Sequence, residues 1–431
     1  MLKFKGSIKI SGDKSISHRA LILSAMSVGK SKITNLLESD DVMSTMKILK
    51  HLGIKIFREG NNWIVYGNGS NGFIEPDKPL DCGNSGTTAR LMIGAVSSNP
   101  INCSFIGDNS LSKRSMSRVT QHLEKIGSEV FLTRKDYLPL MINGSDKLLP
   151  SIHKIQKASA QIKSALILAA INIHGKTKII ENIPTRDHTE RLLKFLGVKF
   201  KIKKLRNRST QIELDGPYEI KSKNIEVAGD PSSASFFVVG ALIVPNSKVT
   251  LKNIMLNPSR IAFLKILKQM GGKLKIKKTR KICGEEVGNI SAEYSQLKGV
   301  IIPSSLSSFL IDEYPILAIA ASQARGKTVM KGLSELRHKE SDRINSILFN
   351  FKKLGINITE KNDNLSIYGK KLKVDKNLII KSFNDHRIAM SFSILNILFQ
   401  NKLKIDNQKC IAISYPDFKK HLNYLLKKTN G

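Results

Sequence analysis

Three short segments combine cations with hydroxyls or carboxylates in a way that suits anion binding and proton transfer. The segment "GDKSISHRAL" holds Lys14, Ser15 and Arg19 within eight residues. Lysine binds phosphate and carboxylate as a point charge, and arginine binds them through two parallel hydrogen bonds. The segments "DEYPILA" and "KESDR" supply the carboxylates of Asp312 and Glu340, which are candidates for proton transfer. These residue types favour substrates with several anionic groups and acid–base chemistry.

Other polar loops carry the same residue types. Their candidate residues are Asn84, Gly86, Thr87, Lys113, Arg114, Arg118, Ser159, Gln161, Arg186, Glu313, Lys339, Arg343, Asp385, His386 and Arg387. Taken singly, most of them fit a solvated surface charge, a buried structural histidine or a helix cap. The segments "DHTER" and "KESDR" also fit capping boxes and i,i+4 pairs, and Asp312 fits a cap for the helix that follows it. Their recurrence in regularly spaced loops favours a shared site.

Each of these loops precedes a helix that is apolar on nearly all sides. The segments are "GDKSISHRALILSAM", "GNSGTTARLMIGAV", "SAQIKSALILAA", "GDPSSASFFVVGAL", "DEYPILAIAAS" and "NDHRIAMSFSIL", and their starts are 71, 76, 70, 83 and 72 residues apart. Helices that are apolar all round are buried. Their N-termini carry free N–H groups and partial positive charge, which bind anions. Two groups of three such helices would direct their N-termini at a common cleft.

A second pattern keeps the same period. Amphipathic helices are followed by glycine and then by a strand, which predicts left-handed C-caps at Gly53, Gly127, Gly197, Gly271 and Gly355. A sixth amphipathic helix, "FKKHLNYLLKK", is expected to end the chain without a following strand. Two patterns with one period predict six copies of a unit that contains two helices and several strands.

The composition indicates a globular protein of ordinary type. A chain of 431 residues favours two domains, and 41% hydrophobic with 24% charged residues is typical of such proteins. We expect a cytoplasmic, bacterial protein, because the sequence contains neither a membrane-length apolar stretch nor a signal or transit segment. The four cysteines form no CxxC pair, so we expect neither a zinc site nor a disulfide framework.

The net charge of +35 raises nucleic acid as a partner. Two basic segments, "KFKIKKLRNR" from Lys199 and "KLKIKKTRK" from Lys273, alternate with apolar residues, which predicts half-exposed strands. They contain almost no aromatic residues on which bases could stack. We therefore favour a lysine-rich surface that attracts anionic small molecules, with an RNA-binding protein as the alternative from another class.

The loop segments resemble, in the same order along the chain, those of the EPSP synthase family, the 3-phosphoshikimate 1-carboxyvinyltransferases. The segments are "GDKSISHRAL", "GNSGTTAR", "LSKRSMSRV", "ASAQIKSALILA", "TRDHTE", "GDPSSASF", "IDEYPILA", "LRHKESDR" and "NDHRIAMSF". The sequences of "DEYPILA", "TRDHTE" and "KESDR" resemble the second bacterial class of the family more than the first. The resemblance implies an α/β fold, a two-domain inside-out α/β barrel with six βαβαββ repeats around buried parallel helices. It also implies a discontinuous domain of residues 1–12 plus 229–431, a second domain of residues 13–228, and an active site in the cleft between them.

The resemblance further implies transfer of the enolpyruvyl group of phosphoenolpyruvate to shikimate 3-phosphate, by addition and elimination, with no metal or other cofactor. The residues implied for shikimate 3-phosphate are Lys14, Ser15, Arg19, Ser159, Ala160, Gln161, Arg186, Asp312 and Lys339. Those implied for phosphoenolpyruvate are Lys14, Asn84, Gly86, Arg114, Gln161, Arg343 and Arg387. Asp312 is the implied base, Glu340 the implied acid, and Lys14 the group that stabilises the departing phosphate. A monomer without nucleic-acid or membrane partners is implied as well.

Two positions depart from variants of the family. Ile413 stands where the first class carries a lysine that reaches phosphoenolpyruvate, so one phosphate contact is expected to be absent or supplied otherwise. Gly86 is glycine where glyphosate-insensitive members of the second class have alanine, so inhibition by glyphosate is expected. The nearest alternative is the related transferase that acts on UDP-N-acetylglucosamine. It typically uses a loop cysteine, which "DNSLSKRSM" lacks, because Cys103 lies upstream in an expected buried strand. An inactive relative is disfavoured, since the acid–base residues are present.

Overall fold

The structure is a computed structural model that describes residues 2–134, 136–206, 209–370 and 378–428. The last two residues of the basic segment that starts at Lys199, residues 207–208, lie outside the described residues. The chain divides into two compact units. Unit 1 consists of Met1–Ser11, Ala228–Lys281 and Glu285–Gly431, and unit 2 consists of Gly12–Val227 and Ile282–Gly284. Among the described residues, no helix is long and apolar enough to cross a membrane.

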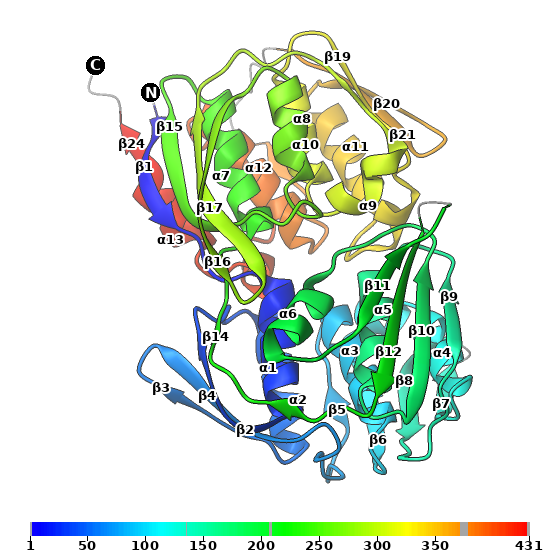
Figure 1. The fold of residues 1–431 in the computed structure, drawn as a ribbon. Helices are drawn as coiled ribbons and strands as arrows, with labels where there is room; N and C mark the ends of the chain where they lie inside the picture. The colour runs from blue at the N-terminus through cyan, green and yellow to red at the C-terminus, as the bar shows by residue number, and fades with distance from the viewer. Residues whose placement is uncertain (1, 135, 207–208, 371–377, 429–431) are drawn as a thin grey trace. The chain divides into compact units, whose positions relative to one another are not determined.

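Unit 2 contains helices and strands in alternation (Figure 1). Its helices are α1 (Lys14–Ala25), α2 (Asp40–His51), α3 (Gly86–Ser97), α4 (Ser117–Glu124), α5 (Ala160–Ala170) and α6 (His188–Leu196), with a 3₁₀ turn η1 (Leu111–Lys113). Its strands are β2 (Ser27–Thr34), β3 (Lys55–Glu59), β4 (Asn62–Asn68), β5 (Leu80–Asp81), β6 (Asn102–Ile106), β7 (Glu129–Arg134), β8 (Tyr137–Asn143), β9 (Ile152–Ile155), β10 (Gly175–Glu181), β11 (Lys201–Lys204), β12 (Thr210–Gly216), β13 (Ile220–Lys221) and β14 (Ile225–Glu226).

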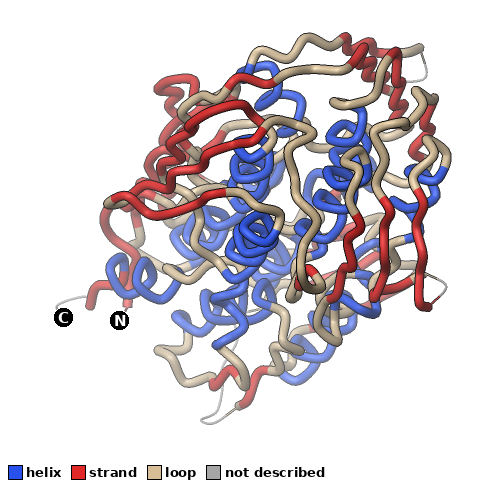
Figure 2. The backbone as a smooth tube through the Cα atoms, turned by 90° about the horizontal axis from the view of Figure 1, so that it is seen from below, coloured by secondary structure: helices blue, strands red, loops and turns tan. Residues whose placement is uncertain are grey.

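The sheets of unit 2 share one pairing scheme. The strand orders are β5-β6-β8-β7, β9-β10-β12-β11 and β13-β2-β4-β3, with β14 also paired to β2. In each sheet the first pair is parallel and the following pairs are antiparallel. Figure 2 shows red strands that lie side by side in groups. Mixed sheets with one recurring order are consistent with repeated units.

Unit 1 follows the same alternation. Its helices are α7 (Pro231–Ile243), α8 (Ala262–Gln269), α9 (Ser307–Leu310), α10 (Tyr314–Ser322), α11 (Arg343–Lys353), α12 (His386–Leu398) and α13 (Phe418–Leu425), with 3₁₀ turns η2 (Ser304–Leu306), η3 (Ser334–His338) and η4 (Lys409–Ile413). Its strands are β1 (Leu2–Lys9), β15 (Lys248–Met255), β16 (Lys273–Ile282), β17 (Glu285–Glu293), β18 (Ile301–Ile302), β19 (Lys327–Met330), β20 (Asn357–Lys361), β21 (Asn364–Tyr368), β22 (Ile379–Ile380), β23 (Lys404–Ile405) and β24 (Leu426–Lys428). The strand β1, at the start of unit 1, pairs with β15, which follows the residues of unit 2 in the sequence.

Two sheets of unit 1 contain the pairing scheme of unit 2, and among the described residues the third consists only of the parallel pair β22-β23. The strand orders are β16-β17-β15-β1-β24, β18-β19-β21-β20 and β22-β23. One prediction is wrong here, because the helix α13 ends at Leu425 and the last three residues of "FKKHLNYLLKK" form the short strand β24, which pairs antiparallel with β1 through Leu2, Lys3 and Phe4. Leu2 and Phe4 are apolar and begin β1, so the end of the chain covers an edge that would otherwise be left unpaired.

The apolar helices that follow the polar loops are buried, as predicted. In α1, α5, α7 and α12 nearly every residue is buried, and α7, α10 and α12 pack against one another in unit 1. Polar side chains cap most of these helices. Asp13, Ser85 and Ser159, for example, accept hydrogen bonds from the backbone N–H of the third residue beyond them. The polar loops therefore begin buried helices at defined positions.

The predicted glycine caps are confirmed, and the basic strands differ in one respect. Gly53, Gly127, Gly197, Gly271 and Gly355 all have φ between +69° and +98°, a region that costs other residues more. The two basic segments do form strands, β11 and β16. However, β11 is exposed along its whole length, and β16 alternates only over its first half. Both are edge strands, and the prediction of half-exposed strands holds only for the first half of β16.

Candidate active site

Lys14 is the first residue of α1, directly after the capping residue Asp13. Its Nζ donates to Oδ2 of Asp41 at 2.8 Å, and both side chains are largely buried. Asp41 lies in the first turn of α2, so the ion pair joins two helix N-termini. A lysine at a helix N-terminus adds a full charge to the partial charge of the backbone N–H groups. This position is suited to an anionic ligand.

Arg19 lies one turn further along α1 and is 4% exposed. Its Nε donates to Oγ1 of Thr189 at 2.7 Å, its Nη2 to Oγ of Ser164 at 2.7 Å, and its Nη1 to the carbonyl oxygen of Ser15 at 2.8 Å. Thr189 belongs to α6 and Ser164 to α5. One guanidinium therefore ties the N-terminal halves of three helices together, and it also fixes the backbone of the predicted binding residue Ser15.

Asn84 and Arg114 meet beside the N-terminus of α3. Nη2 of Arg114 donates to Oδ1 of Asn84 at 2.9 Å, and Asn84 in turn donates to Oδ2 of Asp108 at 2.6 Å. Gly86 is the first residue of α3, and a Cβ built on it would lie 3.6 Å from Nη1 of Arg114. The structure thus brings these three predicted phosphoenolpyruvate residues together. The absence of a side chain at Gly86 lets a ligand approach the backbone.

Gln161 lies in the first turn of α5 and faces Arg90 and Thr87 of α3. Its Oε1 accepts from Nη1 of Arg90 at 2.6 Å, and its Nε2 donates to Oγ1 of Thr87 at 3.0 Å. Nη2 of Arg90 donates to the carbonyl oxygen of Ser115 at 3.1 Å. These bonds fix the orientation of the Gln161 amide, and they connect it to the segment that carries Arg114.

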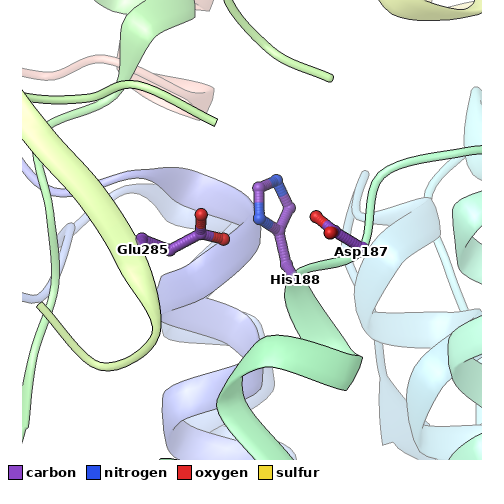
Figure 3. A group of neighbouring side chains, drawn as sticks. All are labelled: Asp187, His188 and Glu285. Atoms are coloured by element: carbon purple, nitrogen blue, oxygen red, sulfur yellow. The ribbon is translucent and has the colours of Figure 1, made fainter. Parts of the chain in front are cut away.

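The remaining predicted residues of unit 2 lie at two helix starts. Ser159 caps α5 by accepting from the N–H of Ile162 at 3.3 Å, and Ala160 is the first residue of that helix. Arg186 is half-buried in the loop before α6. Figure 3 shows the next two residues, Asp187 on the loop and His188 on the first turn of α6. Asp187 accepts from Nε of Arg191 at 2.8 Å, so "DHTER" does contain the i,i+4 pair.

Arg343, the first residue of α11, is the centre of an ionic cluster in unit 1. It is 1% exposed. Its Nε donates to Oδ2 of Asp385 at 2.8 Å and its Nη2 to Oε2 of Glu340 at 2.7 Å, and its Nη1 lies 3.5 Å from Oδ1 of Asp312. Burial acts to lower the pKa of Arg343, but the three carboxylates outweigh it and raise the pKa. The cluster holds both predicted acid–base residues against one permanent cation.

Two further cations complete this cluster. Arg387, in the first turn of α12, donates through Nη1 to the carbonyl oxygen of Asp312 at 2.9 Å, and its Nε lies 3.5 Å from Oδ1 of Asp312. Burial and the charge of Arg343 lower the pKa of Lys339, although Asp312 and Glu340 oppose that shift. The residue before α10 is Glu313, with no side-chain cap bond, so the structure does not support Asp312 as a cap. The carboxylate of Asp312 instead faces Arg343 and Arg387.

Two residues that contact the predicted site, Asp41 and Arg90, were not predicted from the sequence, and a third, Asp385, was a candidate without an assigned role. Asp41 pairs with Lys14 from a segment 27 residues away, and no sequence signal links them. Arg90 stands in the motif "GNSGTTAR", and its place one turn after Gly86 is a signal that points to the same helix face. Asp385 precedes Arg387 in "NDHR" and combines the cap of α12 with the pair to Arg343.

Comparisons with known proteins agree along nearly the whole chain. Residues 2–422 match the profile of the family described as EPSP synthase (3-phosphoshikimate 1-carboxyvinyltransferase). The chain is similar to the 3-phosphoshikimate 1-carboxyvinyltransferase of Parvibaculum lavamentivorans, with 42% identity over 96% of this chain and 92% of the relative. It is 43% identical to that of Petrotoga mobilis, over 95% and 94%. The fold is similar to the EPSP synthase of Acinetobacter baumannii, with a TM-score of 0.85, 35% identity, and coverage of 99% and 98%.

Proposed function

The chain belongs to the EPSP synthase family, and from this premise we propose how its residues divide the work of the reaction. The activity is that of the family. It transfers the enolpyruvyl group of phosphoenolpyruvate to shikimate 3-phosphate, gives 5-enolpyruvylshikimate 3-phosphate and phosphate, and serves aromatic amino-acid biosynthesis. The two substrates together bring two phosphates and two carboxylates, so a site for them needs several cations.

We assign the two substrates to two sets of residues that share Lys14 and Gln161. Shikimate 3-phosphate is held by residues that follow the polar loops, namely Ser15, Arg19, Ser159, Ala160, Gln161, Arg186, Asp312 and Lys339. Phosphoenolpyruvate is held by Asn84, Gly86, Arg114, Gln161, Arg343 and Arg387. Lys14 contacts both substrates. The bond between Arg114 and Asn84, at 2.9 Å, supports this assignment for phosphoenolpyruvate, because it fixes two of its proposed ligands beside Gly86.

The chemistry proceeds by addition and then elimination. Asp312 removes the proton from the attacking hydroxyl of shikimate 3-phosphate as its oxygen bonds to the substituted carbon of phosphoenolpyruvate. Glu340 gives a proton to the methylene carbon, which becomes a methyl group. In the elimination Glu340 takes a proton back from that methyl group and the carbon–oxygen bond to phosphate breaks. Lys14 stabilises the departing phosphate, which leaves with the proton that Asp312 had taken from the hydroxyl. Positioned acid–base groups each contribute about 10²–10⁴-fold in rate.

The observation that carries this assignment is the sharing of Arg343 by both carboxylates. Glu340 accepts from it at 2.7 Å and Asp312 lies 3.5 Å from it. One buried cation therefore holds the proposed acid and the proposed base in one cluster. An arginine keeps its charge at every working pH, so it holds both carboxylates in place while either of them changes its protonation state.

Several finer properties belong to the same proposal. Six βαβαββ repeats form a two-domain inside-out barrel, with residues 1–12 plus 229–431 and residues 13–228 as its domains, and both domains supply residues to one reaction. The protein acts as a cytoplasmic monomer of the second bacterial class. Ile413 packs against the hydrophobic core of unit 1, which suits the loss of a lysine contact there. Glyphosate binds in place of phosphoenolpyruvate, since Gly86 leaves room for it.

The related transferase that acts on UDP-N-acetylglucosamine is disfavoured by the cysteines as well as by the family. Cys103 is buried in β6, and burial raises its pKa to about 12. A reactive cysteine needs the opposite shift, because the thiolate is the reactive form. We therefore assign Cys103 to the core.

Phosphate release from phosphoenolpyruvate plus shikimate 3-phosphate, without added metal, tests the proposal. Release should require both substrates and should fall by about 10²-fold or more in Glu340→Gln, which keeps the shape of the side chain but cannot exchange a proton. Glu335→Gln, on the neighbouring turn η3, is the matched control and should retain activity. Release by Glu340→Gln within a fewfold of the parent would overturn the acid–base assignment.

A further inference from the structure

Lys163 forms a buried ionic cluster that the reaction itself does not require. It lies in the first turn of α5 and is 1% exposed. Its Nζ donates to Oε2 of Glu181 at 2.9 Å and lies 2.8 Å from Oε1 of Glu190. A protein in which well-packed apolar side chains of similar volume replace a buried ion pair is often at least as stable as the original. Stability alone is therefore a weak reason for this cluster.

The three residues lie on the elements that carry predicted ligands of shikimate 3-phosphate. Lys163 stands two residues after Gln161 on α5, Glu181 is the last residue of β10, and Glu190 is in the first turn of α6. The loop of residues 182–187 joins β10 to α6 and contains Arg186. The cluster thus holds both ends of this loop against the start of α5.

A second bond fixes the middle of the loop. The hydroxyl of Thr185 donates to Oε1 of Glu181, the carboxylate that also accepts from Lys163. Thr185 is the residue directly before Arg186. The position of the arginine backbone is therefore linked through one hydroxyl and one carboxylate to the helix that carries Ser159 and Gln161.

Hydroxyl groups extend this connection to α1. Ser164 and Thr189, which directly neighbour Lys163 and Glu190 in sequence, share a hydrogen bond of 2.7 Å. Arg19 donates to both hydroxyls at 2.7 Å. The same contact between α5 and α6 thus orients Arg19, another proposed ligand of shikimate 3-phosphate. By contrast, Asn84 and Arg114 contact each other outside this network.

We propose that Lys163, Glu181 and Glu190 are positioning residues that set the affinity for shikimate 3-phosphate by fixing the Arg186 loop and Arg19 against the start of α5. This inference rests on the proposed function, in which Arg186 and Arg19 hold that substrate. Burial acts to lower the pKa of Lys163, but Glu190 and Glu181 outweigh it and raise the pKa, so the ammonium stays charged. The affinity for phosphoenolpyruvate should depend little on the cluster, because Asn84 and Arg114 are held by each other and not by the Arg186 loop.

Thr185→Val is the sharpest test, because it removes one hydroxyl at a half-buried position and leaves the ion pairs in place. The KM for shikimate 3-phosphate should rise about 10-fold, as expected for the loss of a hydrogen bond to a charged acceptor, while kcat and the KM for phosphoenolpyruvate stay within about twofold. Thr185→Ser should restore the parental value. Thr250→Val removes a half-buried hydroxyl bonded to Ser291 in unit 1 and is the matched control.

Two further variants separate the possible failures. Arg186→Met should raise the KM for shikimate 3-phosphate more than Thr185→Val does, and an unchanged KM there would refute the proposed function of Arg186. The neutral triple variant Lys163→Met, Glu181→Gln, Glu190→Gln should fold and should show the same selective rise. The positioning role is refuted by either of two results, provided that Arg186→Met raises the KM for shikimate 3-phosphate. In the first, Thr185→Val leaves this KM unchanged. In the second, Thr185→Val raises the KM for shikimate 3-phosphate and the KM for phosphoenolpyruvate equally.

Discussion

Asp385 serves two purposes in unit 1, and its replacement by alanine measures both. It is fully buried. Its Oδ1 accepts from the N–H of Arg387 at 2.9 Å and so caps α12, and its Oδ2 accepts from Nε of Arg343 at 2.8 Å. Burial acts to raise the pKa of Asp385, but Arg343 outweighs it and lowers the pKa. The carboxylate is therefore ionised in the folded protein.

The cost of Asp385→Ala follows from these contacts. The loss of a helix cap costs about 1 kcal/mol. The removal of one partner of a buried ion pair costs about 3–5 kcal/mol, because the other charge stays buried with fewer partners. Glu340 and Asp312 still face Arg343 and offset part of that cost. We therefore expect a loss of about 4 kcal/mol in the free energy of unfolding of unit 1.

Thermal unfolding followed by circular dichroism measures this loss. A change of 1 kcal/mol shifts Tm by about 2–4 °C in a domain of 150–250 residues, so Asp385→Ala should lower Tm by about 8–16 °C. Asp342→Ala is the matched control. Asp342 caps α11 by accepting from the N–H of Asn345, but its ion pair with Arg337 is half-exposed. The Tm of the Asp342→Ala variant should therefore be lower than that of the parent by about 2–5 °C.

The comparison of the two variants decides the question. If Asp385→Ala lowers Tm no more than Asp342→Ala does, the pair with Arg343 contributes nothing beyond the cap, and the ionic cluster does not stabilise unit 1. Asp385→Asn should fall between alanine and the parent, because its amide oxygen can still cap α12 while the negative charge is lost.

Two more predictions concern unit 2. Burial lowers the pKa of His153 to about 4 in the folded protein, whereas the usual pKa of histidine is about 6.5. Between these two pH values the unfolded chain therefore binds a proton at His153 and the folded chain does not. Stability should therefore be fully present above pH 6.5 and fall by roughly 3 kcal/mol towards pH 4, and His153→Gln should lose this part of the slope in thermal melts across that range. A Cβ on Gly86 would lie 2.9 Å from Nη1 of Arg90, which holds Gln161. Gly86→Ala should raise the KM for phosphoenolpyruvate about 10-fold, because the loss of one hydrogen bond to a charged group weakens binding by about that factor. It should raise the inhibition constant of glyphosate by a larger factor. If both constants are the same in Gly86→Ala as in the parent protein, this reasoning is refuted.

Local patterns predicted the elements well because each depends on residues close in sequence. The glycines after the amphipathic helices adopt left-handed backbone, and the all-apolar helices are buried. The motifs also marked the loops that bear Lys14, Arg343 and Arg387. These features follow from side-chain type and period alone, so one sequence suffices to read them.

Pairings across the fold were beyond such reasoning. Asp41 meets Lys14 only because α1 and α2 pack together, and Glu181 reaches Lys163 only because β10 ends beside α5. The strand β24 was missed for a related reason, since its three residues gain their hydrogen bonds from β1 at the other end of the chain. Sequence spacing carries no information about such partners.

The internal partners of the proposed ligand cations also bear on which anions these cations would select. Lys14 is paired with Asp41, Arg343 with Asp385 and Glu340, and Arg387 with Asp312. An incoming anion must share a cation with a carboxylate that already holds it. A second carboxylate offers no advantage over the first, whereas a phosphate brings more charge and three oxygens as acceptors. Competition with internal carboxylates therefore favours phosphorylated substrates over simple carboxylic acids, and it supplies specificity without any added contact.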